Sequence, residues 1–102
     1  MVMTDQEYVD EALAAARANF ARLVEICDHV RHIVPGLTPE ACAHFAAVAE
    51  AVRRQLDEAG AMYARGEVDR NAVVLTARRI AVHADQTAIA IELKWLDAPE
   101  VN

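Results

Sequence analysis

The chain has 102 residues, a hydrophobic fraction of 55% and a formal net charge of −6. This length predicts a single domain, residues 1–102, and the hydrophobic content excludes an intrinsically disordered protein. The acidic charge repels phosphate backbones, so nucleic acid is not an expected partner, and no apolar run is long enough to cross a membrane.

The first predicted helix covers about residues 5–33. Thr4 or Asp5 can cap its start, and Glu7 stands where a capping box with Thr4 requires an acidic residue. A turn follows at Gly36, which lies between two prolines and permits a backbone conformation that other residues avoid. The pattern therefore predicts one long helix before the first turn.

The second and third predicted helices follow the same logic. Thr38 is a good N-cap for a helix over about residues 39–65, and Gly66 is typical of the residue that ends such a helix. Asp69 then caps a last helix over about residues 69–96. Short loops between long helices predict an all-α, antiparallel bundle of three helices.

The first two helices each show one apolar face at the helical period of about 100° per residue. In the first helix this face comprises Leu13, Ala16, Phe20, Leu23, Val24, Cys27, Val30 and Val34. In the second it comprises Ala41, Phe45, Val48, Val52, Leu56, Ala59 and Tyr63. One face per helix is what a small bundle can bury.

The third helix differs, because apolar residues lie on two opposite sides. One stripe consists of Val73, Ala77, Ile80, Ala84, Ala88, Ile91 and Trp95. The other consists of Leu75, Val82, Ile89, Leu93 and Leu96, four of which are spaced seven residues apart as in a coiled coil. We expect the first stripe to pack on the other helices and the second to form a homodimer interface that completes the bundle. The alternative places the third helix between the other two, with one stripe on each.

A group of potential metal ligands lies near the end of the first helix. Asp28 and His32 are four residues apart and share a face, His29 is adjacent, and the turn could bring His44 close. Imidazole and carboxylate groups bind divalent metals, and such a site predicts a metal-dependent rise in melting temperature. The spacing matches no established metal motif, so a solvated charged face explains it equally well.

Other reactive residues offer little catalytic chemistry. Serine is absent from the chain, and Cys27 and Cys42 lack the C-x-x-C spacing, which favours buried free thiols. An enzyme would have to place glutamate or histidine as acid or base in a cleft between subunits, and no motif selects a substrate.

These patterns favour a non-enzymatic interaction or regulatory protein. We expect an acidic homodimer that docks on a larger protein through an apolar or acidic face, with no cofactor unless the metal site forms. A metal- or small-ligand-binding bundle using Asp28, His29, His32 and His44 is the alternative. The acidic start lacks the basic and apolar segments of a secretory signal, which predicts a cytoplasmic location.

Overall fold

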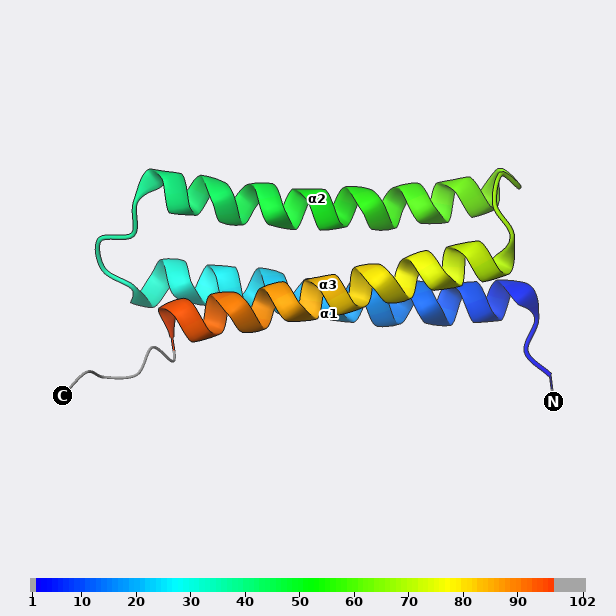
Figure 1. The fold of residues 1–102 in the computed structure, drawn as a ribbon, viewed down its shortest axis with the longest axis horizontal. Coiled ribbons are helices and arrows are strands. Elements are labelled where there is room, and N and C mark those ends of the chain that lie inside the picture. Colours follow the sequence, from blue (N-terminus) through cyan, green and yellow to red (C-terminus); the bar gives the residue numbers. More distant parts are fainter. Residues whose placement is uncertain (1, 97–102) are drawn as a thin grey trace.

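The computed structural model describes residues 2–96, which form three helices. They are α1 (Asp5–Ile33), α2 (Pro39–Ala64) and α3 (Arg70–Trp95). Figure 1 shows the chain running along the length of the molecule and turning back at each loop. The described residues contain no strand, so the all-α class is confirmed, and each predicted boundary lies within one residue of the observed one.

Each helix begins at a side-chain cap. The Thr4 hydroxyl accepts a hydrogen bond from the backbone N–H of Glu7 at 3.2 Å, and Thr38 accepts one from Ala41 at 3.1 Å. The Asp69 carboxylate accepts a hydrogen bond from the N–H of Ala72 at 2.8 Å. These bonds satisfy backbone donors that have no partner inside a helix, and each cap typically contributes about 1 kcal/mol.

The turn after α2 is closed by a Schellman motif. Gly66 has a φ of 73°, and its N–H donates to the Tyr63 carbonyl at 3.0 Å. The N–H of Glu67 donates to the Met62 carbonyl at 2.9 Å. This pair of bonds needs a left-handed residue between the helix and the loop, which glycine supplies without steric cost.

The helices α1 and α3 form the most closely packed pair, and α2 makes less contact with either of them. Alanines at Ala16, Ala77, Ala84 and Ala88 are fully buried. Small side chains allow helix axes to approach closely. The amide of Asn19 on α1 even donates to the backbone carbonyl of Ala81 on α3 at 2.9 Å. In Figure 1, α1 and α3 accordingly overlap for most of their length, whereas α2 stands apart.

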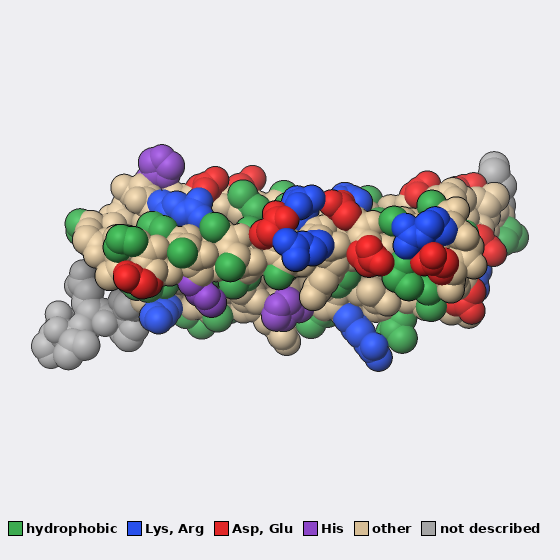
Figure 2. Space-filling model, turned by 90° about the horizontal axis from the view of Figure 1, so that it is seen from above, with side chains coloured by type: hydrophobic (Ala, Val, Ile, Leu, Met, Phe, Trp, Pro, Cys, Tyr) green, Lys and Arg blue, Asp and Glu red, His purple; other side chains and the backbone are tan. Residues whose placement is uncertain are grey.

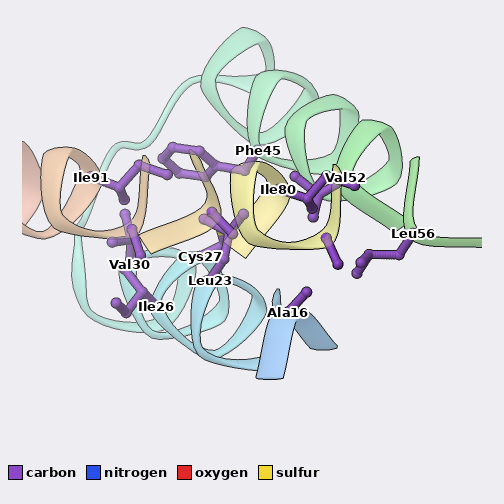
Figure 3. Close-up of a cluster of buried hydrophobic side chains, with 13 residues drawn as sticks. Ala16, Leu23, Ile26, Cys27, Val30, Phe45, Val52, Leu56, Ile80 and Ile91 are labelled. Atoms are coloured by element: carbon purple, nitrogen blue, oxygen red, sulfur yellow. The ribbon is translucent and has the colours of Figure 1, made fainter. Parts of the chain in front are cut away.

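Larger side chains fill the space between α2 and this pair. Figure 3 shows Phe45, Val52 and Leu56 of α2 pointing towards side chains of α1 and α3 such as Leu23 and Ile80. The predicted inner stripe of α3 is confirmed, because all of its members before Trp95 are buried and Trp95 packs against the same core. The core therefore uses one face of α3 and leaves the other outside.

Candidate interaction surface on helix α3

A row of exposed apolar residues, which we call the outer apolar line, follows the outside of α3. Its members are Leu75 (49% exposed), Val82 (55%), Ile89 (41%) and Leu93 (58%). They lie on the side of α3 opposite the buried stripe, and neither α1 nor α2 covers them. The alternative in which α3 lies between the other two helices with both stripes covered is therefore not the arrangement of this protein.

Leu96, the fifth predicted interface residue, occupies a different environment. It is the C-cap of α3, and its side chain is half-buried against the main core together with Trp95. The helical periodicity that places Leu96 in line with Ile89 no longer applies where the helix ends. Leu96 is consequently not a member of the outer apolar line.

Three of the charged residues beside the outer apolar line have no ionic partner among the described residues. Arg78, Arg79 and Glu92 take part in no ion pair within residues 2–96. A shallow hollow of about 300 Å³ beside Val82 is lined by Arg78, Arg79, His83 and Gln86. This part of α3 thus offers both apolar surface and charges that a second molecule could pair.

The face of the molecule formed by α2 contrasts with this surface. Arg53 lies between Glu50 and Asp57 and bonds both, and the bond from Arg53 lowers the pKa of the Glu50 carboxyl. Asp57 also lies 3.5 Å from Arg17 of α1. Figure 2, which views the molecule from the α2 side, shows acidic and basic side chains adjacent to one another. Charges here are largely matched within one chain.

The charge of α3 itself also differs from that of the whole protein. Between Arg70 and Trp95 the sequence has four basic residues and two acidic ones, whereas the whole chain carries −6. Two of these charges already have partners in α1, because Arg70 lies 3.3 Å from Asp5 and Asp85 lies 3.2 Å from Arg22. The remaining charges on α3 are three basic residues and Glu92, so the helix keeps a net positive charge on an acidic protein.

A groove between α2 and α3 is a second surface feature. One hollow in this groove has a volume of about 660 Å³ and an apolar floor of Phe45, Ile91 and Trp95. His44 and Lys94 also line it. Phe45 and Trp95 meet edge to face with ring centroids 6.3 Å apart. This groove could not be predicted from the sequence, because its presence depends on the distance between α2 and the α1–α3 pair.

The four predicted metal ligands are not brought together. The Nδ1 atom of His32 lies 2.7 Å from the backbone carbonyl of Asp28, and the Asp28 carboxylate accepts a hydrogen bond from Arg31 at 2.9 Å. His44 lines the groove between α2 and α3 instead. Within residues 2–96, no group of three or more His, Cys, Asp or Glu side chains is arranged to hold a metal, and histidines lie at separate positions in Figure 2. Metal binding by these residues stays a prediction.

Both cysteines are free, and they differ in environment. Cys27 is buried in the core, where desolvation raises the pKa of its thiol; nearby Arg31 acts in the opposite direction and Asp28 in the same one. Cys42 is half-buried at the start of α2. A buried thiol with a raised pKa is a poor nucleophile, which agrees with a packing role for Cys27.

No protein-family model, curated protein or solved structure matches this chain. The described helices include none that is both long and apolar enough to span a bilayer.

Proposed function

We propose that this protein is a small, non-enzymatic interaction or regulatory module that acts in the cytoplasm as a homodimer. In this proposal, two antiparallel three-helix subunits join through the outer face of α3. The observation that carries the proposal is the outer apolar line, which is exposed in a single chain. A larger protein partner would then dock on a face that the dimer leaves free, such as the acidic surface of α1 and α2.

The size of the outer apolar line limits the strength of such a dimer. Covering a half-exposed Val, Ile or Leu contributes roughly 1 kcal/mol, since complete burial contributes about 1.5–3 kcal/mol. The four side chains of the outer apolar line in each of two copies together contribute roughly 8 kcal/mol to dimerisation. Association itself costs about 4–15 kcal/mol in lost freedom. The residues around the line must therefore also contribute, and we expect a dimer that dissociates on dilution.

A non-enzymatic role is supported by the placement of the ionisable groups. None of the described polar or charged residues is buried. Catalytic acids and bases usually owe their reactivity to burial or to closely spaced like charges. The raised or lowered pKa values of the described carboxyl and guanidinium groups arise instead from surface pairs such as Arg65 with Glu67.

The test is a double substitution in the outer apolar line. Val82→Asp with Ile89→Asp should convert a dimer into a monomer in sedimentation-velocity and native mass measurements, because desolvating carboxylates at the interface is costly. Both side chains are exposed in the single chain, so the circular dichroism spectrum should stay helical.

A matched control introduces the same two charges on the exposed side of α2, as Ala47→Asp with Ala51→Asp. This control should keep the mass of the wild-type protein. A wild-type protein that remains monomeric at high concentration would contradict the proposal, and so would a dimer that survives the α3 substitutions.

A further inference from the structure

The distribution of charge along α3 contains information about how two copies would be oriented. The centre of the outer apolar line falls near Asp85, with Val82 on one side and Ile89 on the other. Arg78 lies before this centre and Glu92 lies after it, each seven residues from Asp85. Seven residues are about two helical turns, so all three lie along the same flank of the line.

We propose that two copies of this chain pair antiparallel along α3, so that Arg78 of each copy faces Glu92 of the partner subunit. This inference rests on the proposed function, because it specifies the geometry of the proposed homodimer. Val82 would lie opposite the partner's Ile89 on both sides of the twofold axis. The two ion pairs would form near the two ends of the outer apolar line.

Symmetry decides which flanks meet. A twofold axis perpendicular to two antiparallel helices brings each flank against the same flank of the partner. The antiparallel pairing therefore joins Arg78 to the partner's Glu92. A twofold axis along two parallel helices instead brings each flank against the opposite one. Arg78 of each subunit would then face Arg79 of the partner subunit at nearly the same position along the helix axis.

Like charges placed directly opposite each other destabilise an interface. Neither arginine has an acidic partner among the described residues of its own chain. The helix dipoles act in the same direction, because antiparallel helices place opposite partial charges side by side. Both electrostatic effects favour the antiparallel pairing.

In the antiparallel orientation, two acidic side chains repel each other at the centre of the interface. An ion pair within each chain reduces this repulsion. Antiparallel pairing brings Asp85 near its own copy at the twofold axis. Each Asp85 carboxylate lies 3.2 Å from Arg22 of the same chain. This ion pair lowers the net charge at the axis. The repulsion at the centre is accordingly weaker than the repulsion between four arginines in the parallel arrangement.

The first experiment exchanges the charges. Arg78→Glu and Glu92→Arg, each alone, should weaken dimerisation about tenfold in sedimentation equilibrium, since each variant creates two like-charge contacts per dimer. The variant with both substitutions should recover wild-type affinity. Lys94→Glu changes the charge of α3 as much as Arg78→Glu but lies on the other flank, so its effect should be smaller. Additive losses in the double variant would overturn the inference.

The second experiment reads orientation directly by disulfide formation. A Val82→Cys chain is mixed with an Ile89→Cys chain, in a background with Cys42→Ala, while the buried Cys27 is left in place. Antiparallel pairing predicts cross-links between the two kinds of chain. Same-position cysteines would be displaced along the axis by about 10 Å, at about 1.5 Å per residue, which is too far for a disulfide.

Cross-links between identical chains would show parallel pairing and overturn the orientation while leaving the homodimer intact. A dimer without any cross-link would place the interface elsewhere and also overturn the inference. A monomeric wild-type protein in native mass spectrometry would remove the proposed function itself, so the two failures are distinguishable.

Discussion

Two glycines in this chain have opposite roles, and the difference comes from their backbone conformation. Gly66 ends α2 with a φ of 73°, a conformation that costs other residues about 1–2 kcal/mol. Gly60 lies inside α2, where its missing side chain makes the helix less stable than alanine would. A methyl group added at Gly60 would meet the Leu13 Cδ1 atom at 3.7 Å, an ordinary van der Waals distance.

Gly66→Ala should therefore lower the free energy of unfolding by about 1–2 kcal/mol. Gly60→Ala should raise it by about 0.5–1 kcal/mol, because alanine restricts the unfolded chain and favours helix. Urea unfolding followed by circular dichroism measures both changes in the same background. Two changes of the same sign would contradict the assigned roles.

The same residue-level signals explain what could be predicted from the sequence. Helix boundaries depend on local groups such as Thr38, Asp69 and Gly66, and these bond within a few residues of themselves. Burial depends on neighbours far away in the sequence. Val9 and Ile26 are buried although neither was placed in the predicted apolar face of the first helix. Ile26 lies at the edge of that face, where the tertiary arrangement decides which side chain is covered, whereas Val9 lies in line with Cys27 and extends the face towards the start of the helix.

At the scale of helices, the protein consists of a close pair and a third helix that stands further away. Fully buried alanines and the Asn19 hydrogen bond to the Ala81 carbonyl characterise α1 and α3. The more distant α2 reaches the pair through larger side chains such as Phe45 and Leu56. Alanine in the core of this protein is therefore a requirement for close approach and not merely a helix former.

Ala84→Leu tests that requirement. The added atoms have no space at a fully buried position on α3, so we expect a loss of about 1–3 kcal/mol and a lower melting temperature. Ala90→Leu is the matched control, because Ala90 is exposed and borders the open groove beside α2. A melting temperature unchanged by Ala84→Leu would mean that the α1–α3 contact adjusts to larger side chains.

Sequence periodicity identified which sides of α3 are apolar, and the structure shows which of them is covered. Sequence periodicity could not predict how α2 is rotated about its own axis or how far α2 lies from the α1–α3 pair. For that reason His44 was expected near His32, whereas it lines the groove with Phe45. The groove and the metal-ligand positions both depend on packing between helices, which a single sequence does not encode locally.

At the scale of the whole molecule, the protein is long and thin, with extents of 55 × 27 × 17 Å. Its radius of gyration is 16.4 Å. A compact chain of this length would have a radius of gyration of about 13 Å. An elongated shape leaves much of each helix at the surface. The exposed outer apolar line of α3 lies on a protein with a net charge of −6, and this uncovered apolar surface is the basis for expecting self-association.

Self-association predicts that thermal stability depends on protein concentration. If only the folded chain dimerises, raising the concentration adds dimerisation free energy to the folded state, and the melting temperature should rise by several degrees over a hundredfold range. Calorimetry over that range measures the rise. The variant with Val82→Asp and Ile89→Asp should melt at one temperature throughout, because its outer apolar line can no longer pair. A wild-type melting temperature that does not change with protein concentration would show that the folded chain is stable as a monomer. The outer apolar line would then be expected to bind a different protein.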